Sequence, residues 1–596
     1  MSTAEAARRD WEARIYQASG AVAPVTEVVL PAPAGLRARP GAGHVTLTWE
    51  PVPGAIGYLV HRDGVSVKQR DVDVPAVPGC RYVDTGQGEC AYQVAAIAAM
   101  DVVGPFSDPV TAGPAETGRE VAVSVDARAV TGTLHRPWTT MIGSEHLSYL
   151  LCREESGGRP IGEELTAALR TMREEFGVET VRAHAILCDD LEVYREVDGK
   201  AVHDFSKVFE VYDTIMAFGL RPVVELGYMP RDLATDPSKT VFGYQAIISP
   251  PKDYDAWGEL VRDLTQALAD RYGLEELVER WAFEVWNEAN LAVFWSGTPE
   301  EYFRLYDVSA AAVKSVHPGL RVGGPSSAAN GWVEELLSHV GKSGAALDFV
   351  STHTYGNAPL DWRPALARHG REDTPIWWTE WGPTPTHFHG IGDGPFGATF
   401  LLHGMKSAAG RLDALSHWVA SDHFEELGRP PRLFHGGFGL LTVGNLRKPR
   451  FHALTLAHRL GPEELAASVE GDQAGVEVWA ARHPDGRVGV LVWNGTLNQA
   501  QADGAPELSR TVRLAVTGLK GTHTLTHHRI DETHSNIRAI WQRMSGADWP
   551  EGEEWERLAE ANTLDELTPA AEVEGDVRLE FDLPMPGVSF VELTPA

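Results

Sequence analysis

Between residues 118 and 465, strand-like apolar segments alternate with stretches of helical periodicity. Strands separated by helices pair in parallel and are buried on both faces, so they read as nearly continuous apolar runs. One helical stretch, residues 205–216, places its apolar side chains on a single face. We count eight strand segments: 139–144, 178–187, 221–228, 281–288, 319–327, 347–355, 375–381 and 414–422. Eight such repeats predict a (β/α)8 TIM barrel over residues 117–465.

The chain on either side of this barrel is predicted to be β-structure of another kind. Its 596 residues exceed what one hydrophobic core of about 250–300 residues accommodates, so a multidomain protein is expected. Residues 28–116 contain short alternating segments at hairpin spacing, which predicts a β-sandwich, and the pattern of Trp49, Tyr58 and Tyr92 resembles a fibronectin type III domain. Residues 466–596 predict a C-terminal β-sandwich with a helical insert at about 531–567, and residues 1–27 predict a helix and a tether.

The composition narrows the range of partners. The net charge is −31, and such a surface repels nucleic acid and anionic membranes. The N-terminus lacks the apolar core of a signal peptide, and no segment is long and apolar enough to cross a bilayer, so we expect a cytoplasmic protein. Cytosolic thiols stay reduced, so we expect free cysteines, although Cys80 and Cys90 stand at a spacing that allows a disulfide across one hairpin.

Two glutamates at strand ends carry the strongest functional signal. Active sites of TIM barrels lie at the C-terminal ends of the strands, where the fourth strand ends in Asn287-Glu288 and the seventh in Glu380. Breaking a glycosidic bond requires two facing carboxyl groups, one protonated and one ionised, about 5–5.5 Å apart for retention and about 6.5–9.5 Å for inversion. Glu225, on the third strand, is expected to support the barrel floor or an arginine such as Arg182, because structural ion pairs are common there.

Histidine clusters and glycine-rich segments give weaker signals. His387, His389 and His403 invite a metal site, but no carboxylate or cysteine stands at ligand spacing, so no metal is predicted. The glycine-rich segments "VGGPSS" and "FHGGFGLL" do not fit a phosphate-binding loop, and no cofactor is expected.

An ordered set of motifs resembles glycoside hydrolase family 39, which contains β-xylosidases and α-L-iduronidases. These motifs are "IGSEHLSYLL", "VRAHAILCDDLEVY", "VVELGYMP", "ISPPKDYDAWGELV", "FEVWNEANLAVFW", "VGGPSS", "TEWG" and "SDHFEELGRPPRLFHGGFGLL". The likeness runs in order through residues 125–465 and continues at "RIDETHSNIRAIWQRM". It implies a retaining double displacement, with catalytic residues on the fourth and seventh strands of the barrel.

The resemblance implies a role for each matching residue. Glu288 matches the general acid/base and Glu380 the nucleophile. For binding the sugar, the matching residues are Asn287 at the 2-hydroxyl, His184 on the second strand, the pair His353 and Tyr355 on the sixth strand, and Trp418, Phe424 and Glu425 after the eighth. The chain departs from the family at Ala289, where "WNEPN" is usual, at "RAHA" in place of "RFHG", and at "TEWG" in place of "TEWN". These departures border the sugar pocket and put the substrate in doubt.

We therefore predict a retaining exo-glycosidase of the β-D-xylosidase type, acting on an oligosaccharide or a small glycoside. Glu288 needs a raised pKa, and Glu380 an ordinary or lowered one. α-L-Arabinosides and β-glucosides are alternatives, whereas a uronide such as iduronate requires a cation, for which Arg363 and Arg368 are the candidates. A non-catalytic carbohydrate-binding barrel is the alternative of another class. A homo-oligomer, with the helical insert as a contact, is a further expectation.

Overall fold

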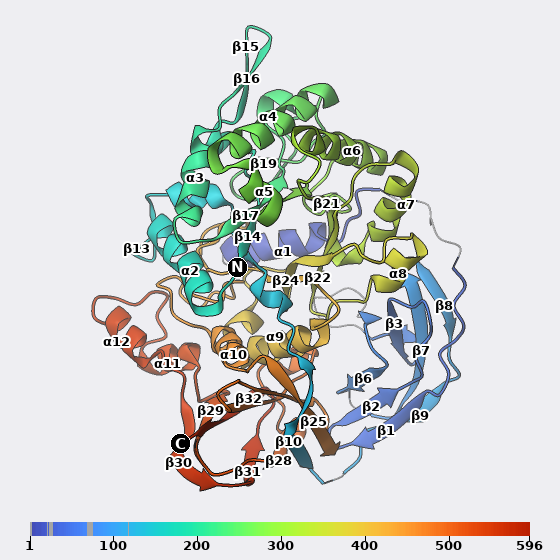
Figure 1. Ribbon diagram of the computed structural model, residues 1–596, viewed down its shortest axis with the longest axis vertical. Helices are drawn as coiled ribbons and strands as arrows, with labels where there is room; N and C mark the ends of the chain where they lie inside the picture. Colours follow the sequence, from blue (N-terminus) through green and yellow to red (C-terminus); the bar gives the residue numbers. More distant parts are fainter. Residues whose placement is uncertain (1–2, 21, 23–27, 68–75, 87, 117) are drawn as a thin grey trace.

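A closed barrel of eight parallel strands forms the centre of the computed structural model (Figure 1). The structure describes residues 3–20, 22, 28–67, 76–86, 88–116 and 118–596. All eight predicted strands are present, and each pairs with its neighbours in chain order. The barrel strands are β11 (Met141–Ser144), β14 (Thr180–Ala183), β17 (Arg221–Leu226), β20 (Ala282–Val285), β21 (Val322–Ser327), β22 (Phe349–Tyr355), β23 (Ile376–Gly382) and β24 (Ala414–His417). The predicted TIM barrel is thereby confirmed.

Helices surround the barrel and begin where their sequences provide caps. Thr298 and Glu301 form a reciprocal capping box at the start of α6, and Asp253 caps α4 through two backbone amides. The outer helices are α2 (Ile161–Phe176), α3 (Ser206–Met216), α4 (Tyr254–Tyr272), α5 (Leu274–Arg280), α6 (Pro299–Val316), α7 (Val333–Ser343), α8 (Arg363–Arg368), α9 (Pro395–Ala408) and α10 (Pro449–His458). Three hairpins extend the loops, namely β12 (Glu155–Ser156) with β13 (Arg159–Pro160), β15 (Tyr194–Val197) with β16 (Lys200–His203), and β18 (Thr240–Val241) with β19 (Ala246–Ile247).

The N-terminal unit consists of two antiparallel sheets around its own apolar core. β1 (Arg37–Gly41), β2 (His44–Thr48) and β6 (Arg81–Asp84) form one sheet. The other contains β3 (Gly57–Arg62), β4 (Val65–Ser66), β5 (Ala76–Val77), β7 (Cys90–Ala99), β8 (Val102–Phe106) and β9 (Val110–Ala112). Trp49 packs edge-on against Tyr58 in the core between the sheets. The likeness to fibronectin type III stays a prediction. Cys80 and Cys90 are free thiols, so no disulfide joins them.

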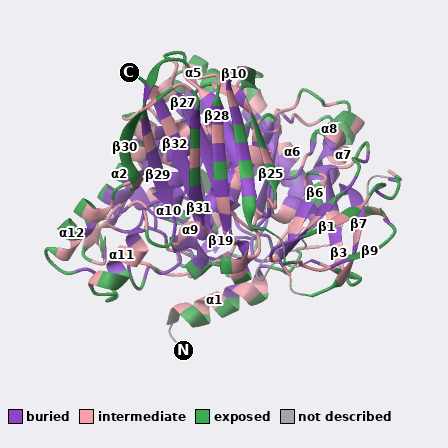
Figure 2. Cartoon of the chain, turned by 90° about the horizontal axis from the view of Figure 1, so that it is seen from below, coloured by how far each residue is buried: buried purple, intermediate pink, exposed green. Residues whose placement is uncertain are grey.

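The C-terminal β-structure is one continuous sheet of nine strands. Its order is β30 (Glu566–Glu574), β29 (Thr522–Ile530), β32 (Gly587–Pro595), β27 (Val488–Asn494), β26 (Val476–Arg482), β25 (Glu463–Gly471), β10 (Glu120–Thr133), β28 (Arg510–Thr517) and β31 (Val577–Leu583). Figure 2 shows buried and exposed residues alternating along β10 and β28. The structure places all nine strands in one hydrogen-bonded sheet, and the two-layered sandwich stays a prediction. The helical insert contains α11 (Ile537–Met544) and α12 (Glu554–Ala561).

Strand β10 corrects the predicted boundary at residue 117. It precedes the barrel in the sequence, yet it pairs with β25 and β28 of the C-terminal sheet. Its alternating Val121, Val123 and Val125 enter the core of that sheet, so their burial explains the pairing. Helix α1 (Thr3–Arg14) lies in the middle of the ring of barrel helices in Figure 1. Among the described residues, none of the helices combines the length and apolar composition that spanning a bilayer requires.

Candidate active site

The carboxyl ends of the barrel strands bring the predicted polar residues together. Arg182 comes from β14, Glu225 from β17, His353 and Tyr355 from β22, and Glu380 from β23. Asn287 and Glu288 follow β20 through a sharp turn, with φ of 67° at Trp286 and 44° at Glu288. Positive φ is costly for residues with side chains, and such strain is concentrated at functional sites. The turn therefore marks the segment that carries Glu288 as a functional one.

Arg182 is the centre of the polar network beneath the site. Its side chain is fully buried and lies 2.7 Å from Glu225, 2.8 Å from Glu284 and 2.5 Å from Glu380. It also donates hydrogen bonds of 2.8 Å to Asn287 Oδ1 and 2.9 Å to Ser326 Oγ. A planar guanidinium suits this role, because its five N–H groups can serve several acceptors at once. The predicted pairing of Glu225 with Arg182 is confirmed.

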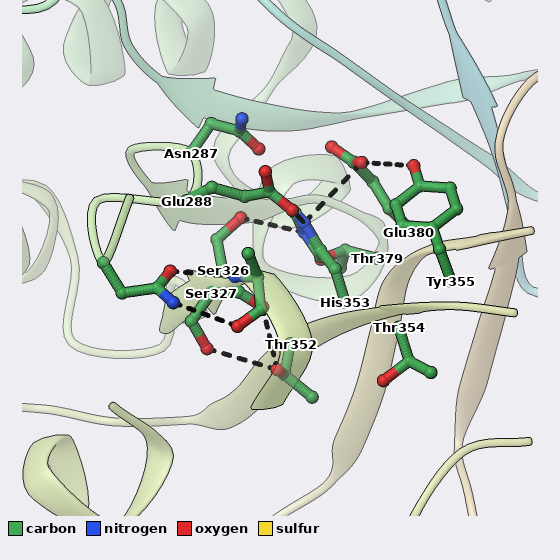
Figure 3. A network of polar contacts seen from close by, with 12 residues as sticks. Asn287, Glu288, Ser326, Ser327, Thr352, His353, Thr354, Tyr355, Thr379 and Glu380 are labelled. Carbon is green, nitrogen blue, oxygen red and sulfur yellow. Dashed lines mark hydrogen bonds and ion pairs between the residues drawn. The ribbon is translucent and has the colours of Figure 1, made fainter. Parts of the chain in front are cut away.

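Glu380 has neighbours that favour its ionised form and oppose the effect of burial. Tyr355 donates a 2.6 Å hydrogen bond to Oε2 (Figure 3). Arg182 donates to Oε1. Burial raises the pKa of Glu380, while Arg182, His184 and the Tyr355 hydroxyl oppose that shift. The expectation of an ordinary or lowered pKa was therefore wrong in direction, because loss of hydration outweighs the attraction of one shared cation.

Glu288 lies in a setting that favours its protonated form. Burial raises its pKa well above the usual range, and the nearby charge of Glu380 adds to the shift. His353 Nδ1 lies 2.8 Å from Glu288 Oε1 and 3.6 Å from Glu380 Oε2 (Figure 3). Burial and Arg182 lower the pKa of His353 well below its usual range, so this imidazole is neutral and does not stabilise a Glu288 anion by charge. Glu288 thus has the protonation that a general acid needs.

The separation of the two carboxyl groups bears on the stereochemistry. An oxygen of Glu288, an oxygen of Glu380 and a nitrogen of His353 all lie within 4.8 Å of one another. Retaining glycosidases keep their carboxyl groups about 5–5.5 Å apart, because one must reach the anomeric carbon directly. These three groups are also close enough to hold a cation, but two carboxyl groups at this spacing are what double displacement requires. The geometry therefore matches a retaining pair.

A cavity of about 150 Å³ lies above this pair. Of the predicted binding residues, Asn287, His184, Tyr355 and Trp418 line it together with both glutamates. His353 lies directly beneath and reaches both carboxyl groups. Trp418 packs over Arg182 and against His184, so it forms a wall beside the network. Burial and Arg182 lower the pKa of His184 to about 3, which leaves a neutral imidazole facing the cavity.

Phe424 and Glu425 do not line the cavity, among the residues that the structure describes. Phe424 packs behind Trp418 against Phe438, and Glu425 pairs with His146 at 3.0 Å. The next residue, Glu426, faces the cavity instead, with Oε1 3.5 Å from His184 Nε2. Adjacent acidic residues after β24 give no sequence signal that says which one points inward. Burial and the neighbouring carboxylates raise the pKa of Glu426 well above its usual range.

The other candidate residues from the sequence are held elsewhere. His403 pairs with Glu477 at 2.6 Å on the C-terminal sheet, whereas His387 packs among Phe388, Phe424 and Phe438. Arg363 pairs with Asp361, and Arg368 binds Glu334 and two carbonyl groups of the N-terminal unit. Neither arginine reaches the cavity. Sequence reasoning missed the cavity residues Trp11, Ile15 and Met100, which come from outside the barrel.

Comparisons with known proteins agree with this geometry. The family model for glycosyl hydrolases family 39 matches residues 121–366 and 363–578. A β-xylosidase of Caldicellulosiruptor saccharolyticus is 30% identical over 485 residues, which span 78% of this chain and 96% of the relative. A β-xylosidase of Geobacillus stearothermophilus is 30% identical over 73% of this chain and 90% of its own length. The crystal structure of a monomeric β-xylosidase from Caulobacter crescentus superposes with a TM-score of 0.70 at 29% identity, covering 80% and 99% of the two chains. The chain therefore belongs to glycosyl hydrolases family 39 and is a glycoside hydrolase.

Proposed function

We propose that the protein hydrolyses β-D-xylosides from their non-reducing ends with retention of configuration. The observation that carries the proposal is the buried pair of Glu288 and Glu380, with carboxyl oxygens within 4.8 Å of each other in the lining of one cavity. Their different surroundings fit different tasks. Glu288 has burial and a neighbouring anion to keep it protonated, whereas Glu380 has Arg182 and Tyr355, which favour its carboxylate and oppose the rise in its pKa.

The reaction takes two displacements at the anomeric carbon. Glu380 Oε attacks this carbon while protonated Glu288 gives its proton to the leaving oxygen, so the glycosidic bond breaks and a glycosyl-enzyme forms. Glu288, now a carboxylate, removes a proton from water as the water attacks the same carbon and releases Glu380. Asn287 is fixed by Arg182 through its amide oxygen, and its amide nitrogen donates to the Tyr228 hydroxyl at 3.3 Å. It lines the cavity where we place the sugar 2-hydroxyl.

The cavity lining favours a neutral sugar. Among the described residues that line it there is no lysine or arginine, and the buried Arg182 is already engaged by three carboxyl groups. The carboxylate of a uronide would lose its hydration there without gaining a cationic partner. A pentose or hexose without charge has no such penalty. The β-xylosidase names of the two bacterial relatives then favour xylose among neutral sugars.

Initial rates on 4-nitrophenyl glycosides test the proposal. The panel contains the β-D-xyloside, the α-L-arabinosides, the β-D-glucoside and the α-L-iduronide, with Glu380→Gln as the control. We expect the β-xyloside to be cleaved fastest, and the substitution to remove at least about 10³-fold of the rate, because the nucleophile is lost. A faster rate on another sugar, or turnover that survives the substitution, would refute the proposal. The predicted homo-oligomer stays a separate prediction.

A further inference from the structure

The segment before the N-terminal unit is fixed to the loop that carries the general acid. Ala18 and Leu291 form an antiparallel bridge, and the backbone N–H of Ala292 donates a 2.7 Å hydrogen bond to Gln17 O. The backbone N–H of Ser19 donates to Asn290 O at 3.1 Å, and its hydroxyl donates to Ala289 O at 2.6 Å. Residues 17–19 therefore follow the chain directly after Glu288 like a short added strand.

Trp11 extends the same segment to the loop after the nucleophile. The indole N–H donates a 3.1 Å hydrogen bond to Pro385 O, five residues beyond Glu380. Its ring stacks on Phe242 and meets Phe294 edge-on, and the whole side chain is only 5% exposed. Residues 11–19 thus link the loops of both catalytic glutamates across the barrel mouth, where α1 lies in Figure 1.

The lining of the cavity consequently has a polar part and an apolar part. Asn287, His184 and Glu426 are polar and line it together with the catalytic pair, whereas the apolar part consists of Trp11, Ile15 and Met100 with Leu291 and Phe294 of the acid loop. The family model begins at residue 121, so Trp11, Ile15 and Met100 all lie outside the part of the chain that it matches. These three apolar residues are therefore contributed by chain outside the part that the family model matches.

We propose that residues 11–19 and Met100 form the leaving-group site, and that this site selects a small apolar aglycone, aryl or alkyl, over a further sugar of a chain. The proposal rests on the proposed function. The leaving group lies beside its proton donor Glu288, and Leu291 and Phe294 follow Glu288 on one loop. A sugar brings several hydroxyl groups, each of which must lose water and find a partner.

Among the described residues, several polar side chains of the cavity lining are already engaged and cannot serve such hydroxyl groups. The Asn330 amide is already engaged, since its oxygen accepts from Trp362 and its nitrogen donates to Thr354. Asn357 Oδ1 has no hydrogen-bond partner among the described residues, but it is buried away from the surface of the cavity. An apolar wall suits an aryl or alkyl aglycone, whose only oxygen is the glycosidic one, rather than a xylose unit with a hydroxyl group on every side.

Placing a charge in the wall tests the proposal with a matched control. Met100→Asp puts a carboxylate at the cavity, whereas Val103→Asp places the same charge on another exposed position of the N-terminal unit. Phenyl β-D-xyloside is compared with xylobiose and xylotriose, so that only the aglycone differs. We expect wild-type kcat/KM to favour the phenyl glycoside, and Met100→Asp to reduce that preference about tenfold, which corresponds to loss of about 1.4 kcal/mol of apolar binding.

The outcomes separate this inference from the proposed function. Wild-type enzyme that prefers xylotriose, or a Met100→Asp preference equal to that of Val103→Asp, would overturn the aglycone site while leaving xylosidase activity intact. If another sugar proves to be the glycone, the same aglycones are compared on that sugar, and the preference among them in kcat/KM decides the inference. Trp11→Ala gives a second measurement without added charge. Its expected effect is a higher KM for the phenyl glycoside with an unchanged pH profile, and unchanged KM values for all three substrates would contradict the proposal.

Discussion

The floor and the outer wall of the cavity are built on opposite principles. The floor is a network of charged groups around Arg182, fully buried and supplied by strands of one barrel. The wall is apolar and includes residues such as Trp11 and Met100 from chain outside the barrel. Every group of the floor depends on the charge of another, whereas each wall residue contributes its own contact area. The barrel therefore supplies the catalytic groups. The wall residues select the leaving group, and they can change without disturbing those catalytic groups.

The floor has more acids than its cation can balance. Arg182 contacts Glu225, Glu284 and Glu380, and it opposes the raised pKa values of both Glu288 and Glu426. Loss of hydration makes every additional buried anion costly, so protons must remain on some of these carboxyl groups. The excess of acids is thus what keeps Glu288 protonated. The comparison predicts that substitutions in the floor change activity and stability strongly, and that substitutions in the wall change them little.

The largest effect is expected from Arg182→Met. Removing one partner of a buried ion network costs about 3–5 kcal/mol, because the remaining charges lose their compensation. Activity should disappear together with stability, since Glu380 and Asn287 are both positioned by this guanidinium. Urea denaturation at pH 7 measures the loss. Arg363→Met is the matched control, because Arg363 pairs with Asp361 at the surface and should contribute at most about 1 kcal/mol.

The pH dependence of that loss tests its cause. Without Arg182, the folded state raises the pKa of Glu225 and Glu380 further above their unfolded values. Groups with raised folded-state pKa values stabilise below the unfolded pKa and lose that contribution as the pH rises through the folded pKa. The deficit of Arg182→Met should therefore be smaller near pH 4 than at pH 7. An equal deficit at both pH values would point to lost packing instead.

The same division between floor and wall separates what the sequence predicts from what it does not. The eight strands and the pair Glu288 and Glu380 were predicted because periodicity and strand-end motifs are local. Strand β10 was placed in the wrong unit, because its partners stand more than 300 residues away in the sequence. Glu425 was chosen in place of Glu426 since the turn after β24 decides which side chain faces inward. Trp11 lies in a charged helix that contains no motif. Its role depends on the loops that it contacts, and these are distant in the sequence.

Glu288→Gln is expected to have the next largest effect, and one that depends on the leaving group. For methyl β-D-xyloside, which needs a proton on its leaving oxygen, kcat/KM should fall by about 10²–10⁴-fold. For the 2,4-dinitrophenyl glycoside, whose leaving group departs as an anion, kcat/KM should change little. Wild-type activity should also fall as the pH rises through the raised pKa of Glu288, because the acid is lost. That alkaline decline should vanish for the variant on the activated substrate.

A different pattern would assign the proton to another group. An equal loss on both substrates, with the alkaline decline retained, would mean that Glu288 positions the sugar and that the acid lies elsewhere. Glu426 is then the residue to change, because it lines the same cavity and its pKa is also raised well above the usual range.

The smallest effect is expected from Ser19→Ala, which weakens the wall and leaves the floor intact. The substitution removes the 2.6 Å hydrogen bond to Ala289 O, and one such bond contributes about 0.5–1.5 kcal/mol. The backbone bridge between Ala18 and Leu291 stays, so residues 17–19 remain docked on the acid loop. KM for phenyl β-D-xyloside should rise by only a few-fold, consistent with that energy. Both limbs of the pH profile should stay in place, because no group in contact with Glu288 or Glu380 has changed. A shifted limb after Ser19→Ala would show that the wall influences the protonation of the catalytic pair, and the separation of floor from wall would then be wrong.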